Sequence, residues 1–450
     1  MSHAVSRSPG LWLAALGVTL TVWLCPAPVL ASMGDVFGLS ARSQAMVNAA
    51  VASTDDWENA YLNPSALALM SPGVKVGFGY TFVFSGLKAG GEDQGLVGND
   101  GITAGVAGII PLAGVMENRL AAAFTLFLPR KDIMWLHLHM KDSIHFPRYE
   151  NRMQRLVVRP ALAARLYESL SLGVAINYYI ELTGGLETRS DATRSLDSRS
   201  NLELFHRFSA DFSLSGEPLE GLRLALVYRM EHRTPTHFLT QNRIGDIMLD
   251  LDITGTCLYE PHTLTAGASY RFDRIGLLLE LDASWRMWHF YPSPFTILDA
   301  SVPSGTPQNK TFDPVAVDVG ANDTVSLGLA AEQTFTVAAR WTVSLRGGLG
   351  YESKALPYQD GETNLMDSHV VKAGLGFGFG YTREDGSPFV SVDLGAQFHI
   401  LPWQTYTKKD ELMVDADLVE SGLQCENPGY PKVSGGGFVA ATGLTVRIEL

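Results

Sequence analysis

The chain has 450 residues and a formal net charge of −13, with 46% hydrophobic and 18% charged residues. The acidic excess argues against nucleic-acid binding, which relies on a clustered basic surface, and the three cysteines neither form a disulfide scaffold nor have zinc-site spacing. The mean hydropathy of +0.07 is high for a soluble protein and low for a helical membrane protein, and beyond the N-terminus no apolar run approaches the roughly 18 residues of a spanning helix.

The first 31 residues have the pattern of a secretory signal peptide. Arg7 gives a positive start, residues 11–25 are apolar, and Val29-Leu30-Ala31 offers small residues where a signal peptidase reads them. A membrane anchor is the alternative, but the apolar segment is short and its flank suits cleavage after Ala31. A lipoprotein signal at Cys25 is disfavoured because bulky Trp23 and Leu24 precede that cysteine. We therefore expect the protein to leave the cytoplasm.

From residue 73 onward the chain alternates with a period of two. In residues 74–84 the even positions are apolar, whereas most odd positions are polar or glycine, and the pattern recurs in residues 222–231, 277–287 and 390–400. Successive strand side chains point to opposite faces, so these segments predict strands with one continuous apolar face. A soluble sandwich also alternates, but its outward face would be the charged one and its strands would be shorter.

Segment length and connections favour a transmembrane barrel. The segments run to about 10 residues or more, and short turns alternate with long loops, as in outer-membrane barrels. The eighth segment contains Pro261 and is either bent or two pieces, and an even number of strands places both barrel ends on the periplasmic side. The predicted strands are 73–86, 101–111, 119–128, 156–166, 171–183, 201–214, 221–232, 246–272, 276–289, 323–334, 341–353, 369–381, 388–400 and 436–450.

The predicted inward faces carry the charges of the strands. Charged side chains that face lipid are costly, while those that face a lumen are tolerated. The charged residues alternate in step with the non-apolar face of each strand, which supports the assignment of that face to the lumen. A lumen Arg or Lys could hold a ligand carboxylate, but for most of these charges we expect pairing with each other or with the N-terminal segment. The set is Lys75, Arg159, Arg165, Arg223, Arg229, Glu231, Glu280, Asp282, Arg286, Arg346, Glu352, Lys372 and Asp393.

Residues 32–72 do not alternate. Near the end of this segment, Asn63-Pro64-Ser65 follows Asp55-Asp56 and lies shortly before the first predicted strand. Taken alone, Asn-Pro-Ser is a turn initiator. In this position it resembles the hatch of the FadL/TodX family of outer-membrane transporters for long-chain fatty acids and other hydrophobic compounds, with Ser65 in place of the family's alanine. Residues 261–272, the tryptophans Trp285 and Trp288, and residues 341–353 resemble later family segments.

The resemblance covers the chain from Asp35 to its C-terminus. It implies an all-β fold, an antiparallel barrel of about 14 strands with an N-terminal hatch that plugs the lumen, and a monomer that needs no energy-coupling motif. The domains would be the signal peptide (1–31), the hatch (32–72) and the barrel (73–450). The family releases its ligand sideways through a wall gap at a kink in the third strand, yet residues 119–128 contain no Gly or Pro. The last strand alternates up to Leu450, where outer-membrane barrels usually have an aromatic residue.

The loop after the third predicted strand is unusually apolar for a segment that faces water, and exposed apolar patches mark binding sites. Flexible methionines suit varied hydrophobic ligands. The patch argument leaves ligand capture and inward packing of this loop equally open, and the resemblance favours capture, because the family uses apolar extracellular loops as a first site. Three nearby histidines, His137, His139 and His145, lack an acidic or cysteine partner that would complete a metal site. The predicted ligand-binding residues are Met134, Trp135, Leu136, Leu138, Met140 and Phe146.

We expect passive transport of hydrophobic compounds across the bacterial outer membrane, with no cofactor. The expected partners are hydrophobic small molecules, outer-membrane lipid and lipopolysaccharide, and no nucleic acid. The alternatives are a general diffusion porin and a relative that exports lipid or protein. An outer-membrane lipid hydrolase is disfavoured because the sequence has no His-x-Ser pair and no G-x-S-x-G motif.

Overall fold

The computed structural model describes residues 34–94, 100–130, 144–150, 156–190, 196–244, 247–295, 297–301, 318–409 and 429–450. None of the helices in these ranges is long and apolar enough to cross a membrane. The helices are α2 (Gly34–Phe37), α3 (Ala41–Ala45), α4 (Asn59–Leu62), η1 (Pro64–Leu69), η2 (Gly114–Met116), α5 (Pro147–Glu150) and η3 (Trp288–Phe290). The strands are β1 (Val74–Ser85), β2 (Leu87–Ala89), β3 (Glu92–Gln94), β4 (Asp100–Ile109), β5 (Leu120–Pro129), β6 (Val157–Tyr167), β7 (Leu170–Ser190), β8 (Leu196–Leu219), β9 (Leu222–Arg229), β10 (His232–Ile244), β11 (Ile247–Glu260), β12 (Thr263–Phe272), β13 (Leu277–Arg286), β14 (Ile297–Ser301), β15 (Thr324–Ala338), β16 (Trp341–Glu352), β17 (Val370–Thr382), β18 (Pro388–Thr407) and β19 (Lys432–Glu449).

Fourteen strands form a closed antiparallel barrel, which confirms the predicted fold class. The order around the wall is β1–β4–β5–β6–β7–β8–β9–β12–β13–β15–β16–β17–β18–β19. The barrel closes where the first strand pairs with the last, from Lys75 opposite Glu449 to Ser85 opposite Val439. A closed barrel leaves no unpaired edge, so every spanning strand has both neighbours that its backbone groups need in lipid.

The alternation of the sequence sets which side chains face out. On β1 the even positions face away from the lumen, and Phe78 there is 55% exposed, while Lys75 at an odd position is buried. Leu349 and Leu375 are likewise exposed, whereas Arg346 and Asp393 are buried. The predicted inside and outside phases are thus observed.

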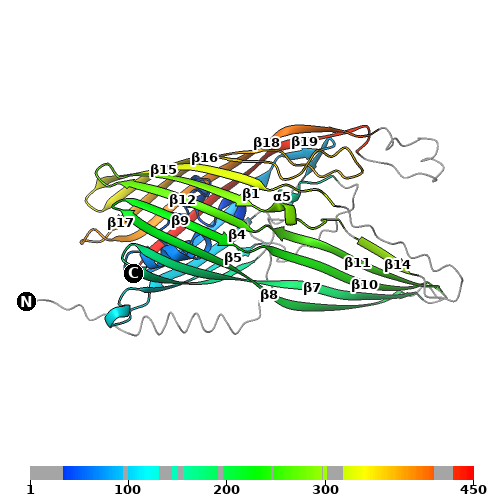
Figure 1. Ribbon diagram of the computed structural model, residues 1–450, viewed down its shortest axis with the longest axis horizontal. Helices are drawn as coiled ribbons and strands as arrows, with labels where there is room; N and C mark the ends of the chain where they lie inside the picture. Colours follow the sequence, from blue (N-terminus) through cyan, green and yellow to red (C-terminus); the bar gives the residue numbers. More distant parts are fainter. Residues whose placement is uncertain are drawn as a thin grey trace, which may run out of the picture.

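The two ends of the barrel differ (Figure 1). At what we call the turn end, the connections are short: 110–119, 168–169, 220–221, 273–276, 339–340 and 383–387. The C-terminus lies there too, with the backbone of Leu450 bonded to Val74. At the opposite, loop end, β7 and β8 run beyond the barrel wall together with β10, β11 and β14.

This extension, which we call the loop-end sheet, continues the barrel sheet in the order β8–β7–β10–β11–β14, in which β10 runs parallel to β7. Of the two alternatives for the predicted eighth strand, 246–272, the structure has two pieces, β11 and the barrel strand β12, with Pro261 between them. Proline has no N–H to donate to a ladder and its ring restricts the preceding residue, so the chain breaks there. β10 and β14 were not predicted.

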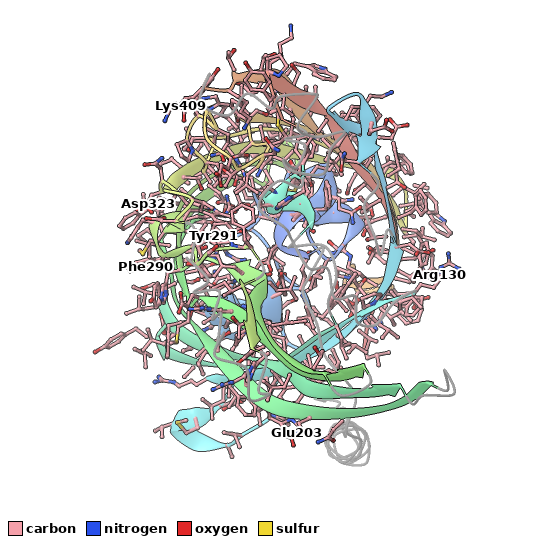
Figure 2. All side chains as sticks on the ribbon, turned by 90° about the vertical axis from the view of Figure 1, so that its right-hand side faces the viewer. Arg130, Glu203, Phe290, Tyr291, Asp323 and Lys409 are labelled. Atoms are coloured by element: carbon pink, nitrogen blue, oxygen red, sulfur yellow. The ribbon has the colours of Figure 1, made fainter. Side chains whose placement is uncertain are left out.

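Residues 34–70, which we call the N-terminal segment, lie inside the barrel. Figure 2 views the barrel from the loop end and shows the ribbon of this segment, in blue, within the ring of strands. Trp57 is fully buried, and its ring lies over the backbones of Gly77 and Gly105 in the wall. A Cβ added at Gly77 would come 1.6 Å from the indole nitrogen, so only glycine allows this contact.

Candidate functional site: the lumen and its mouth

Glu58 holds the N-terminal segment in shape. Its carboxylate accepts hydrogen bonds from the backbone N–H of Leu39 at 3.0 Å and of Ser40 at 3.1 Å. The hydroxyls of Ser40 and Ser43 donate to the same carboxylate at 2.5 and 2.6 Å. These four hydrogen bonds connect α3 and the turn before it to Glu58. They also compensate the cost of burying the Glu58 carboxylate, which would be high without hydrogen-bond partners.

The Asn63-Pro64-Ser65 motif fastens the segment to the barrel wall. The Asn63 amide donates to the Val51 carbonyl and to the Ser215 hydroxyl, both at 2.8 Å. The Ser65 backbone N–H donates to the Ser213 hydroxyl at 2.7 Å, and the Ser65 hydroxyl donates to Asn63 at 2.6 Å. The motif therefore does more than start a turn, because both of its polar side chains bond to β8.

A chain of ion pairs links the same segment to the opposite part of the wall. Arg42 binds Glu332 at 2.9 Å, and Arg346 binds both Glu332 at 2.5 Å and Asp393 at 2.6 Å. Arg447 extends the chain from Asp393 at 3.0 Å to Asp56 at 3.1 Å. Charges of opposite sign alternate along this chain, and all of its members are buried or nearly so, where screening by salt is weak.

A second charged group surrounds Tyr61. The guanidinium carbons of Arg159 and Arg229 lie 4.5 and 4.9 Å from the centre of its ring, within cation–π range. Both arginines bind Asp211, and Arg229 also binds Asp35 of the N-terminal segment. On the β1 side, Lys75 binds Asp55 at 3.2 Å.

The expected lumen charges are therefore largely paired, as predicted. Several of their acidic partners, Asp35, Asp56, Asp211 and Glu332, were not predicted as lumen residues. Asp211 and Glu332 lie in predicted strands at positions whose phase points inward, so their alternation with apolar neighbours was a usable signal. Asp35 and Asp56 lie in the predicted hatch, but this segment does not alternate, so nothing in the sequence singled out these two side chains as partners of the wall charges.

A cavity of about 100 Å³ lies between the N-terminal segment and the wall formed by β9, β12, β13 and β15. A smaller one of about 20 Å³ shares part of its lining, including Tyr61 and Glu260. The larger cavity is lined by the charged residues Asp35, Arg229, Glu260, Asp282, Arg286 and Lys372, together with smaller side chains. The lining also includes the apolar residues Val51, Leu62 and Val227, so the described space beside the segment is of mixed polarity.

Helix α5 covers the N-terminal segment at the loop end. Arg148 binds Glu352 at 2.8 Å and Asp367 at 3.1 Å, and it also donates to the carbonyl of Ser353 at 3.0 Å. Burial alone would lower the pKa of Arg148, but these two carboxylates raise it above its usual value. Tyr149 bonds to Nδ1 of His399 at 3.0 Å, and that imidazole lies 4.6 Å from the ring of Phe37.

Apolar side chains gather at this mouth in two clusters. The first is the mouth end of a larger cluster that also includes Phe37, Trp57 and Tyr61 of the N-terminal segment. At the mouth its members are Phe146, Tyr149, Met366, Leu401 and Tyr406. The second lies against β11, β13 and β16 and comprises Tyr259, Trp288, Tyr291, Phe295, Val319, Ala355, Leu356 and Leu365. Figure 2 labels Tyr291, which is buried in this cluster, and its neighbour Phe290, which is 54% exposed.

No protein-family model matches the chain, and no curated protein matches its sequence. Among solved structures, a Pseudomonas aeruginosa FadL homologue matches with a TM-score of 0.54 and 12% identity, covering 94% of this chain and 99% of that one. The chain has the FadL/TodX fold. The P. putida toluene transporter TodX matches with a TM-score of 0.53 and 12% identity over 92% of this chain and 99% of its own. The Ralstonia pickettii toluene transporter TbuX matches with a TM-score of 0.52 and 13% identity over the same shares.

Within the described residues of β4, β5 and β6 there is no lateral gap of the kind that the FadL/TodX resemblance implied at the third barrel strand. β4 and β5 pair without interruption from Gly101 opposite Pro129 to Ile109 opposite Ala121. β5 and β6 pair in the same way from Leu120 opposite Ala164 to Phe127 opposite Val157. The reason is local: no Gly or Pro within residues 120–128 interrupts the ladder of β5.

Most of the predicted capture residues, Met134 to Met140, lie outside the described residues, as do His137 and His139. Phe146 is described and is only 2% exposed, so it packs inward into the first mouth cluster. His145 is buried beside Phe295, with ring centres 6.3 Å apart. The sequence did not predict α5, whose Arg148 and Tyr149 bring this part of the loop into the mouth.

Proposed function

We propose that the protein is an outer-membrane transporter through which hydrophobic compounds cross passively. The observation that carries this proposal is a lumen occupied by residues 34–70, with two clusters of apolar side chains at its loop end. A general porin conducts solutes through an open, water-filled lumen, so neither a filled lumen nor an apolar mouth is expected in it. The fold agrees with this function, since two solved structures that share it are named as toluene transporters.

In this proposal the loop end faces outward and the turn end faces the periplasm. Residues 1–31 are a cleaved signal peptide, residues 32–72 form the hatch, and residues 73–450 form the barrel of a monomer. Both barrel ends then lie on the periplasmic side, as for bacterial barrels with an even number of strands. The protein would be no enzyme and would need no cofactor.

The cargo would be a long-chain fatty acid or a similar lipid or hydrocarbon. Met134, Trp135, Leu136, Leu138 and Met140 would capture it, and Phe146 would pass it to the mouth clusters. A polar head group could then meet Arg286 and Lys372, which line the cavity beside the hatch.

The continuous ladders of β4, β5 and β6 favour release along the lumen over sideways release into the membrane. The described cavities beside the hatch are small, about 100 and 20 Å³, so a fatty acid could pass only if the hatch shifts. Movement of the hatch is thus the step that this proposal requires.

Uptake and leak assays together test the proposal. Cells that lack other fatty-acid transporters should take up labelled fatty acid when they produce this protein, whereas liposomes that contain it should not swell in sugar solutions. Sugar-driven swelling without fatty-acid uptake would instead establish a general porin. Outward movement of lipid from preloaded vesicles, without uptake, would establish an exporter.

Deletion of residues 133–141 tests the capture site. It removes the predicted capture residues but leaves Phe146 and Arg148 in the mouth, so the barrel should assemble. We expect reduced uptake at low ligand concentration, and unchanged uptake would contradict the assignment. A matched control is the deletion of residues 112–116, an exposed apolar connection at the turn end.

A further inference from the structure

Three tyrosine–histidine pairs of the same geometry lie on the outer wall. The Tyr228 hydroxyl bonds to Nδ1 of His262 at 2.9 Å, with the ring planes 6° apart. The Tyr351 hydroxyl bonds to Nδ1 of His369 at 2.7 Å, with the planes 16° apart. Tyr178 and His206 repeat the arrangement, with ring centres 5.6 Å apart.

A fourth histidine is held by a carboxylate. Nδ1 of His289 bonds to Asp323 at 2.5 Å, and the indole N–H of Trp285 donates to the other oxygen of the same carboxylate at 3.0 Å. The histidine belt, as we call His206, His262, His289 and His369, thus has each ring fixed through Nδ1 by a side chain from a neighbouring strand or loop.

The belt lies at the loop end and faces away from the lumen. His262 directly precedes β12, His369 directly precedes β17, and His289 follows β13, so these three mark the loop ends of barrel strands. His206 is two residues from Phe208, which is 65% exposed and so points outward on the same strand. Tyr228, Tyr351 and Trp285 share the phase of their strands' outward leucines, which include Leu226, Leu349 and Leu281.

Rings at this level are expected in a barrel, because aromatic girdles flank the apolar band at both membrane interfaces. Plain aromatic residues would satisfy that role. The histidines add a polar atom, Nε2, on the side of each ring away from its partner. For His262 the tautomer is settled, because the backbone N–H of Glu231 also donates to Nδ1 at 3.1 Å. Nδ1 is then an acceptor, so the hydrogen of the neutral ring is on Nε2.

We propose that the three tyrosine-held histidines of the belt, His206, His262 and His369, donate Nε2–H hydrogen bonds to the phosphate groups of the outer-leaflet glycolipid, lipopolysaccharide. His289 is excluded, because its Nδ1–H is donated to Asp323 and Nε2 of its neutral ring is an acceptor. The inference rests on the proposed function for one point only, that the loop end faces outward. The belt is continuous with the lipid-facing wall, and phosphate oxygens at that depth accept strong, charge-assisted bonds. Two carboxylates lie beside the belt: Asp323 is bonded to His289 at 2.5 Å, and Glu231 lies 3.9 Å from Nε2 of His262, beyond hydrogen-bond distance.

Binding of two lipids that differ only in their phosphates tests the proposal. The full mature protein in detergent is titrated with bisphosphorylated lipid A and with dephosphorylated lipid A of the same acyl chains, and bound lipid is counted by native mass spectrometry. The variant replaces each of the three donor histidines by phenylalanine (H206F, H262F and H369F), which keeps a ring at the interface. We expect at least an approximately tenfold loss of affinity for the phosphorylated lipid, the equivalent of one or two hydrogen bonds to a charged group, and no change for the other lipid.

An equal loss for both lipids, or no loss for either, would overturn the proposal. The matched control is H237F, because His237 lies on β10 of the loop-end sheet, where it binds Asp252 at 2.8 Å. Heat-dependent migration on a gel verifies that each variant has a closed barrel. Fatty-acid uptake by the same variants separates the two proposals. Unchanged lipid A binding with normal uptake would contradict only the belt proposal, and absent uptake by a protein that binds lipid A as expected would contradict only the transport proposal.

Discussion

At the scale of single residues, the close contacts between the wall and the N-terminal segment depend on glycines in the wall. Trp57 lies against Gly77, and the turn at Ser65 approaches Gly173, where an added Cβ would come 2.1 Å from the Ser65 nitrogen. Periodicity identifies these glycines as inward positions, but it does not reveal that their lack of a side chain is what admits the segment. That knowledge requires the partner, which lies more than 100 residues away for Gly173.

Gly77→Val should destabilise the protein by roughly 1–3 kcal/mol, because it forces an extra side chain into a packed interior. The melting temperature of the barrel, followed by heat-dependent gel migration, measures this loss. Gly361→Ala is the control, because nothing lies within 4 Å of a Cβ built there. Equal melting temperatures for the Gly77 variant and wild type would show that Trp57 does not pack as described.

The contact of Asp323 with His289 should be sensitive to acid. Burial alone would raise the pKa of Asp323, but hydrogen bonds from the His289 side chain and backbone, and from the indole of Trp285, hold it below its usual value. A carboxyl whose pKa is depressed by folding stabilises the native state fully above its unfolded pKa of about 3.9, and this stabilisation disappears as the pH falls through the folded pKa. Asp323→Asn should therefore be less stable than wild type at pH 7, and the difference should vanish near pH 2 in parallel melting experiments.

At the scale of elements, the sequence predicted the barrel strands well, because period two is read directly from each strand. It failed where structure depends on partners. β10 and β14, which were not predicted, belong to the extension of β7 and β8, and α5 is held by Arg148 against residues more than 200 positions away. Similarly, the resemblance singled out Asn63-Pro64-Ser65, but it did not predict that serines on β8 would bond to these residues.

Breaking the buried ion-pair chain should loosen the N-terminal segment. Glu332→Gln leaves Arg42 and Arg346 close together without their shared carboxylate, and loss of one partner from a buried pair costs about 3–5 kcal/mol. We expect faster swelling of liposomes in small sugars, since the segment then fills the lumen less firmly. Glu384→Gln is the control, because Glu384 pairs with Arg340 at an exposed turn. Swelling as slow as that of wild type would mean that other contacts suffice to hold the segment.

At the scale of the whole molecule, two cross-links distinguish release along the lumen from release through the wall. In a background with Cys257 and Cys425 replaced by serine, cysteines at Val106 and Phe124 join the facing strands β4 and β5. Cysteines at Val51 and Gly267 join the N-terminal segment to β12, since a Cβ at Gly267 lies 3.3 Å from that of Val51, close to disulfide range.

We expect fatty-acid uptake to persist with the first cross-link and to stop with the second until a reductant is added. The reason is that the wall already pairs continuously between β4 and β5, while the segment must shift for cargo to pass. Loss of uptake with the first cross-link alone would instead show that cargo leaves sideways between β4 and β5. Retention of uptake with the second would mean that cargo passes a stationary segment.

The seam between β1 and β19 also constrains the order of assembly. The N-terminal segment precedes β1 in the chain, and it contacts the seam from inside: the Gln44 amide bonds to Thr81 at 2.7 Å, and its side chain lies against Gly443. Once the last strand has bonded to the first, a segment left outside would have to thread through a finished ring. The segment must therefore collapse into the nascent barrel before the seam closes, and a chain whose segment folds late would close around an empty lumen.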